Sequence, residues 1–295
     1  MNKVSNNSEN IFLFSIDLED VRFWMVDGLK YAERVPLMIK RYLDFLDAHH
    51  FKATFFVVGD VARAYPELIA KIAGLGHEIA CHSNKHIPLV EMNATSFKAD
   101  LAENIRLLNI AGIKEVHGFR APIYSMTEKT VWAYKVLADL GFTYSSSVFP
   151  AKNPMYGWPD FSMQPQFVEN CIWEIPITLF KSKLISVPVA GGVYFRTLPF
   201  FITKKLLRSK WKKGHPVSGY FHPYDIDEGQ EHFMHPGINN SKLFNFLMYH
   251  NRKKVFPRLE TIIDKKVLIV PYIEYTLSNL KNESKMSITE KLNQS

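Results

Sequence analysis

The residues best suited to chemistry in this chain are two histidines four positions apart and a group of carboxylates near the N-terminus. His82 and His86 flank the run Ser-Asn-Lys. On a helical turn, this spacing places both imidazoles on one face, where they can reach a single metal ion. Asp17, Glu19 and Asp20 directly follow a strand-like apolar run. Two histidines and one carboxylate, with positions open for water, form the ligand set of a hydrolytic zinc site, and they also suit other divalent ions.

Three further residues extend this constellation, although each has a structural alternative. One carboxylate of the acidic group could act as a general base, or the group could cap a turn and be solvated. Arg120 could hold such a base ionised through a charge-assisted hydrogen bond, or it could form a surface ion pair. His222, which is followed by Pro223, could be either a catalytic or a structural histidine.

Alternating strand and helix patterns predict the elements that position these residues. Short apolar runs at 11–16, 53–58, 78–81 and about 116–119 are typical of strands. Helical patterns follow each run, beginning near Pro36, at Pro66, at Thr95 or Ser96, and at about Thr127. Four strand–helix units in a row predict a parallel α/β sheet, and Asp17, His82 and Arg120 then fall at the carboxyl ends of strands, where such folds build their sites.

The second half of the chain is less regular. We expect irregular structure from Tyr144 to about Pro199, a helix at 200–213, a strand at 218–221 ending at His222, helices at 241–251 and 255–264, and a last apolar run at 267–272. No repeat or clean boundary divides the chain, which favours one domain over 1–278, with a helical C-terminal extension and a polar, frayed tail at 279–295.

Composition restricts the cellular setting and the partners. The 295 residues include two cysteines, which excludes a disulfide framework. Neither a signal peptide nor an apolar run of about 18 residues is visible, so we expect a cytoplasmic protein. The net charge is +7, and much of the excess lies at 204–213. No nucleic-acid-binding motif accompanies it, so we expect no nucleic-acid partner, whereas peripheral contact with a membrane through this basic helix is left open.

The order of these motifs resembles the NodB homology domain of the polysaccharide deacetylases, which are carbohydrate esterase 4-like proteins. The resemblance covers about 11–227 and is carried by Asp17 with Glu19 or Asp20, Gly76-His77-Glu78, His82-Ser83-x-x-His86, Arg120-x-Pro122 and Phe221-His222. Three further stretches, Trp173-Glu174-Ile175-Pro176, 191–196 and 222–227, are similar to a branch associated with exopolysaccharide and surface-glycan clusters. The resemblance implies a deformed (β/α) barrel with fewer than eight units.

The resemblance also implies roles for the individual residues. Asp17 would be the general base and His222 the general acid, while Arg120 would orient Asp17. His82, His86 and a carboxylate from Glu19 or Asp20 would hold a divalent metal ion; zinc is expected, with cobalt, nickel or manganese as alternatives. Such an acid–base pair predicts a bell-shaped pH–rate profile.

Two positions depart from the family pattern. Leu18 follows Asp17 where relatives commonly have a second aspartate, so the metal-binding carboxylate must come later; strand alternation slightly favours Glu19 over Asp20. Ser145 stands where relatives often carry an aspartate. We therefore expect Glu174 to take over that role by hydrogen bonding to His222.

The function that the resemblance implies is hydrolysis of an N-acetyl or other acyl amide on an amino sugar, in a surface polysaccharide or its lipid-linked precursor. Tyr124 and Tyr194, with Pro122, are the expected substrate contacts, and Trp158 and Tyr224 are further aromatic candidates for stacking on sugar rings. The alternatives are a small-molecule amidohydrolase at the same site and a catalytically inactive glycan-binding module. The sequence specifies neither the sugar, the acyl group nor the oligomeric state.

Overall fold

The computed structural model describes residues 10–153, 155–169, 171–182, 186–263 and 266–280. Most of the polar tail expected at 279–295 therefore lies outside the described residues. Within them, a nine-stranded sheet has the order β10-β1-β2-β3-β4-β5-β7-β6, and β11 pairs with β1. Its strands are β1 (Asn10–Leu18), β2 (Thr54–Val57), β3 (Glu78–Cys81), β4 (Gly118–Phe119), β5 (Tyr144–Ser145), β6 (Gln166–Val168), β7 (Ile172–Glu174), β10 (Val217–Phe221) and β11 (Val267–Val270).

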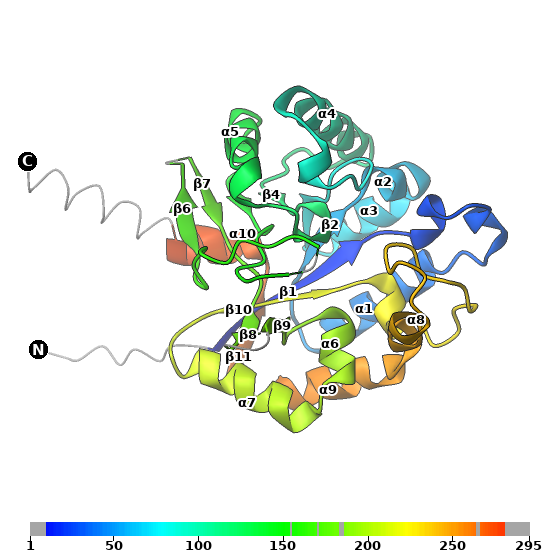
Figure 1. Cartoon of the computed structure of the whole chain (residues 1–295). Coiled ribbons are helices and arrows are strands. Elements are labelled where there is room, and N and C mark those ends of the chain that lie inside the picture. Colours follow the sequence, from blue (N-terminus) through cyan, green and yellow to red (C-terminus); the bar gives the residue numbers. More distant parts are fainter. Residues whose placement is uncertain (1–9, 154, 170, 183–185, 264–265, 281–295) are drawn as a thin grey trace, which may run out of the picture.

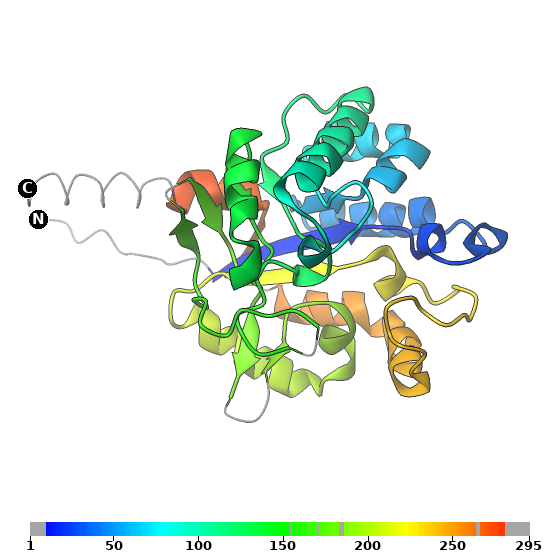
Figure 2. The same ribbon diagram turned by 45° about the horizontal axis from the view of Figure 1, so that its top comes forward.

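The sheet is parallel except for the β6–β7 pair, and it curls into an open half-barrel (Figure 1). Most of the helices pack around its outside. The helices are α1 (Val35–Ala48), α2 (Gly59–Ala64), α3 (Pro66–Gly74), α4 (Ala94–Ile110), α5 (Trp132–Asp139), α6 (Gly192–Thr197), α7 (Phe200–Trp211), α8 (Lys242–Tyr249), α9 (Val255–Ile262) and α10 (Tyr272–Tyr275). A separate antiparallel pair, β8 (Leu179–Lys181) and β9 (Ser186–Pro188), lies near α6 (Figure 2). The expected α/β class and deformed barrel are confirmed.

Strand β1 lies at the centre of the fold. It pairs with β10 along Phe12–Ile16, with β11 through its first residues and with β2 through Ser15–Leu18. Phe12, Phe14 and Ile16 pack with the surrounding helices, whereas Leu13 packs with Phe56 and Tyr272 inside the curl. Because side chains alternate along a strand, Ser15 and Asp17 also face the inside of the curl, and the strand carries carboxylates to its open end.

Several expected boundaries are confirmed, and others are corrected. Helix α3 begins at Pro66, as predicted, and α7 begins at Phe200. Helix α4 is capped by Asn93 and not by Thr95 or Ser96: the Asn93 side chain accepts the Ser96 N–H, and Ser96 Oγ accepts the Asn93 N–H. Helix α6 lies in the stretch where we expected no helix before Pro199. In the described residues, no helix combines the length and the apolar character needed to cross a bilayer.

Candidate active site

An open cleft of about 620 Å³ lies where the carboxyl ends of the strands meet. The cleft lining includes Asp17, near the end of β1, His82, which directly follows β3, and His222, which directly follows β10. Glu19 and His86 also line it. Residues from both halves of the chain are therefore brought together at one edge of the sheet.

Glu19, His82 and His86 form a compact cluster of donor atoms. One ligand atom from each lies within 4.8 Å of the others. Glu19 Oε2 is 3.2 Å from His86 Nε2 and 3.9 Å from His82 Nε2. Two imidazole nitrogens and one carboxylate match the donor set of catalytic zinc sites, so the residues fit the divalent ion that the sequence predicts.

The electrostatics of the cluster favour its metal-binding protonation states. Burial and the neighbouring His86 lower the pKa of His82 to about 3, so its imidazole is neutral at pH 7. The Nδ1 of His82 lies 2.8 Å from the Arg120 carbonyl oxygen, an arrangement that fixes the proton on Nδ1 and leaves Nε2 as the donor atom. Burial raises the pKa of Glu19, but the nearby histidines lower it more, so the carboxylate is ionised.

The two histidines do not lie on a helical turn, as the spacing suggested, but in a loop after β3. Ser83 and His86 adopt left-handed backbone conformations, with φ of 62° and 54°. The Ser83 hydroxyl accepts the His86 N–H at 2.8 Å, and Trp24 stacks on the His86 ring with centroids 4.1 Å apart. Non-glycine residues with positive φ cost energy and persist only where surrounding contacts hold them.

Helix α4 supplies much of that support. Asn104 is buried and donates from Nδ2 to the carbonyls of Val57 and Ser83, at 3.0 and 2.7 Å. One turn earlier, Asp100 accepts the N–H groups of Asn84 and Lys85. The sequence analysis missed both residues. The available signal was a polar residue, Asn104, within the buried stripe of a helix, where an unpaired amide would be costly.

Asp20 is turned away from the histidines. Its side chain accepts three hydrogen bonds of 2.7–3.0 Å from the Arg22 guanidinium and one of 3.1 Å from the Arg22 backbone N–H. It thereby caps the short helix η1 (Val21–Trp24). The sequence left open whether Glu19 or Asp20 is the carboxylate of the metal-ligand cluster. The geometry favours Glu19.

Asp17 and Arg120 form a buried ion pair. Arg120 Nη1 lies 2.5 Å from Asp17 Oδ1 and 2.7 Å from Ser15 Oγ. The guanidinium also donates to the Tyr272 hydroxyl and stacks over the Phe56 ring at 3.9 Å. Asp17 Oδ2 has no hydrogen-bond partner among the described residues, so the arginine fixes one oxygen and leaves the other for chemistry.

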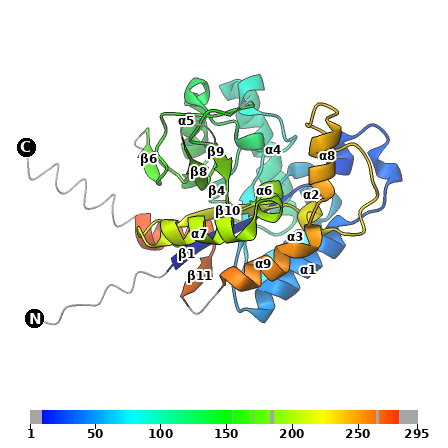
Figure 3. The ribbon, with the colours of Figure 1, turned by 60° about the horizontal axis from the view of Figure 1, so that its bottom comes forward.

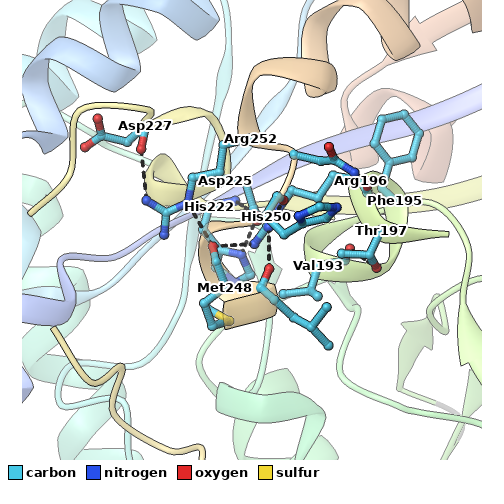
Figure 4. A network of polar contacts seen from close by, with 12 residues as sticks. Val193, Phe195, Arg196, Thr197, His222, Asp225, Asp227, Met248, His250 and Arg252 are labelled. Atoms are coloured by element: carbon cyan, nitrogen blue, oxygen red, sulfur yellow. Dashed lines mark hydrogen bonds and ion pairs between the residues drawn. The ribbon is translucent and has the colours of Figure 1, made fainter. Parts of the chain in front are cut away.

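His222 is paired with a residue that the sequence analysis did not select, Asp225 (Figure 4). The imidazole Nδ1 lies 2.9 Å from Asp225 Oδ2, and the His222 backbone N–H donates to the same oxygen. Arg196 donates from Nε to Asp225 Oδ1 at 3.0 Å, and both Asp225 and Arg196 are fully buried. Tyr224 stacks on the His222 ring with centroids 4.6 Å apart.

These neighbours shift the proton affinity of His222. Burial lowers the pKa of His222, but the charges of Glu19 and Asp225 and the Asp225 hydrogen bond outweigh burial and raise it to about 9. His222 Nε2 lies 3.8 Å from Glu19 Oε1, on the side of the metal-ligand cluster. The group is therefore protonated at neutral pH and faces the cleft.

The expected role of Glu174 is corrected. Glu174 is buried and accepts the backbone N–H groups of Ser147 and Val148 at 2.7 and 3.0 Å, and it lies 3.2 Å from the Tyr134 hydroxyl. Through these contacts, the Glu174 carboxylate holds the segment after β5 in place. The carboxylate on His222 is instead Asp225, three residues along the same chain. The signal available in the sequence was an acid at i+3 after a histidine followed by proline.

Only some of the expected substrate contacts lie in the cleft. Tyr124, Tyr194 and Tyr224 line the cleft. Pro122 is buried and is not part of the lining, and Trp158 packs on Phe161 away from it. The Tyr124 hydroxyl is buried without a hydrogen-bond partner among the described residues.

Two family models match the chain. Residues 27–145 match the polysaccharide deacetylase family, and residues 146–268 match a domain of unknown function, DUF3473. The match to the polysaccharide deacetylase family is carried by the first of these segments. The resemblance stated from the motifs is thus confirmed.

Relatives by sequence carry related names. A segment of 69 residues is 33% identical to a peptidoglycan-N-acetylglucosamine deacetylase of Bacillus cereus and covers 23% of this chain and 25% of that protein. A segment of 88 residues is 33% identical to a chitooligosaccharide deacetylase of Sinorhizobium fredii and covers 30% of this chain and 41% of that protein. The chain thus matches less than half the length of these two relatives.

Solved structures agree on the fold. A putative polysaccharide deacetylase from Mycobacterium smegmatis superposes with a TM-score of 0.60 at 19% identity, over 94% of this chain and 92% of that one. An allantoinase superposes with a TM-score of 0.57 at 12% identity, over 93% of both chains. At these identities the likeness establishes the architecture alone.

Proposed function

We propose that this chain is a divalent-metal-dependent N-deacetylase that hydrolyses the acetamide of an N-acetylated amino sugar. The observation that carries the proposal is the meeting of three units in one cleft: the Glu19–His82–His86 cluster, the Asp17–Arg120 pair and the His222–Asp225 pair. The names of the relatives indicate N-acetylated glycans as the class of substrate. Zinc is the expected ion, held by Glu19, His82 and His86.

The bound ion would polarise the amide carbonyl and lower the pKa of an attacking water. Asp17 then accepts a proton from that water at Oδ2, because Arg120 occupies Oδ1. As the carbon–nitrogen bond breaks, His222 gives its Nε2 proton to the leaving amine. Asp225 keeps Nδ1 oriented and supports the imidazolium. Water and amide are thereby converted to acetate and a free amino sugar.

The proposal is tested by measuring metal content and acetate release together. We expect about one divalent ion per chain in the wild type and loss of both metal and acetate release in H82A/H86A. The substrate is a water-soluble N-acetylated chitooligosaccharide. The double variant H117A/H232A, which removes two histidines outside the cleft lining, is the matched control and should keep both properties.

A wild-type protein that binds no zinc, cobalt or nickel and releases no acetate would contradict the proposal and favour an inactive glycan-binding module. The fold shared with an allantoinase supports a second candidate, a small-molecule amidohydrolase. Allantoin assayed in parallel distinguishes the two, since hydrolysis of allantoin without acetate release would favour the second.

A further inference from the structure

The end of the molecule that carries the cleft also carries an unusual set of exposed apolar side chains. They come from two protruding segments, residues 21–32 after β1 and helix α8. The side chains are Val26 (91% exposed), Leu29 (72%), Leu243 (67%), Phe246 (60%) and Phe244 (57%), which we call the apolar rim. Large exposed apolar side chains that gather at one end of a molecule mark an interaction site more often than scattered ones do.

The two segments lie at the same end of the protein in Figures 1, 2 and 3, beyond the carboxyl end of β1. They are linked through the loop before α8: Tyr31 packs on Phe233 at 4.9 Å, and the Phe233 N–H donates to the hydroxyl of Tyr249 in α8 at 3.0 Å. Both segments border the cleft: Trp24 and Met248 are among its lining residues. The rim therefore lies beside the mouth of the site and is not a remote patch.

Helix α8 is anchored without burying its own apolar face. None of its residues is buried, and its C-terminal carbonyls are held from below by two arginines. Arg196 donates to the carbonyls of Leu247, Met248 and His250, and Arg252 donates to that of Met248 (Figure 4). The helix is thus fixed to the core by its backbone, which leaves Leu243, Phe244 and Phe246 directed away from it.

Charges flank the apolar face of α8 at both ends. Lys242 begins the helix, and Lys253 and Lys254 follow it; all three are exposed and form no ion pair with the described residues. Among the nearby acids, Glu228 pairs with Arg41 and Glu231 accepts the Ala32 N–H, whereas Asp27 and Glu33 are exposed in and beside the other rim segment, as is Lys30. Large apolar side chains bordered by lysines are typical of a helix that lies in a membrane interface.

We propose that the apolar rim docks this protein on the surface of a bilayer that contains anionic lipids, with the cleft facing the membrane. Combined with the proposed function, on which this second step rests, the substrate is an N-acetylated sugar presented at the bilayer. The basic helix α7 does not provide this orientation. Its Lys204, Arg208 and Lys212 line a groove with Asn10 and Val267, the first residues of β1 and β11, at the end of the sheet opposite the cleft.

Vesicle co-sedimentation of the full chain tests the docking surface without any substrate. The wild type should sediment with vesicles of phosphatidylglycerol and phosphatidylcholine, and L243S/F244S/F246S should reduce the bound fraction about tenfold at limiting lipid. The matched control is I110S/F201S, which removes exposed apolar side chains of α4 and α7 (63% and 71% exposed) and should bind within about twofold of wild type. A third variant, K204S/R208S/K212S, should also retain binding.

Three results would overturn the proposal. The first is a wild type that does not sediment, and the second is an α8 variant that sediments like the wild type while K204S/R208S/K212S does not. The third is a dimer that the α8 variant converts to monomer without vesicle binding, which would make a second copy of the chain the occupant of the rim. Acetate release from the water-soluble chitooligosaccharide should be unchanged in the α8 variant. Loss of vesicle binding with intact hydrolysis therefore separates the docking surface from the proposed function.

Discussion

The imidazole of His222 is held between two carboxylates, Glu19 and Asp225, and their charges determine the pH range in which it carries a second proton. Its pKa is raised to about 9, so the acid form is present below that pH and is lost as the pH rises through it. A cation on Glu19 would neutralise one of the charges that raise the His222 pKa and move this limit to lower pH. The contribution of Asp225 would remain, because that carboxylate lies on the other ring nitrogen.

We predict that D225N moves the alkaline limb of the kcat/KM profile to lower pH by about one unit and lowers kcat about 10- to 100-fold. The reason is that the neutral amide no longer stabilises the imidazolium. E174Q is the comparison variant, and its alkaline limb should match the wild type, since Glu174 contacts Ser147 and Val148. A limb that moves in E174Q but not in D225N would restore the role first expected for Glu174.

The two carboxylates that the sequence could not separate should differ in metal affinity. E19Q removes a proposed ligand and should weaken zinc binding by at least about 100-fold, whereas D20N should change it less than about threefold. Competition titration against a chelating dye measures both. D20N should instead lower thermal stability, because Asp20 caps η1 and pairs with Arg22. Equal loss of zinc in both variants would contradict the geometric assignment.

Among the secondary-structure elements, α8 and the short helix η6 (Pro223–Ile226) are joined through one buried guanidinium, that of Arg196. We predict that R196M lowers the free energy of unfolding by about 3–5 kcal/mol, because it leaves the Asp225 carboxylate buried with less compensation. Urea denaturation measures the change. In the double variant R196M/D225N, part of the loss should be recovered, since the uncompensated charge is also removed. Losses that simply add would show that Arg196 and Asp225 act independently.

Prediction from the sequence succeeded where the signal lay within a single helix or strand. Helices α3 and α7 begin where proline and apolar spacing placed them, and the strands ending at Asp17, His82 and His222 were found from short apolar runs. Such signals are local. The contacts that were missed are long-range: Asn104 reaches the loop of His82 across 21 residues, and Arg196 reaches Asp225 across 29. Hydrogen-bond partners that distant leave no periodic pattern in the sequence.

At the scale of the whole molecule, the resemblance predicted more of the site than spacing did. It named Asp17, His82, His86, Arg120 and His222, which the structure brings to one cleft or to a direct contact with it. The spacing of the two histidines suggested a helical turn, yet they lie in a loop with positive φ that only tertiary contacts stabilise. Glu174 was misassigned because the hydrogen-bond donors that an acid in a strand contacts depend on which segments the fold brings near it.

The pairing of β10 with β1 has a consequence for the two matched segments of the chain. The proposed ligands His82 and His86 lie in the first matched segment, and Asp17 and Glu19 precede it. The proposed proton donor and its partner lie in the segment whose family carries no function in its description. That segment is not an appendage, because its strand completes the sheet on the edge of β1 that β2 does not occupy. In terms of inheritance, neither matched segment alone carries all the groups of the proposed reaction. If the second segment were exchanged for another, the proposed reaction would need a different proton donor.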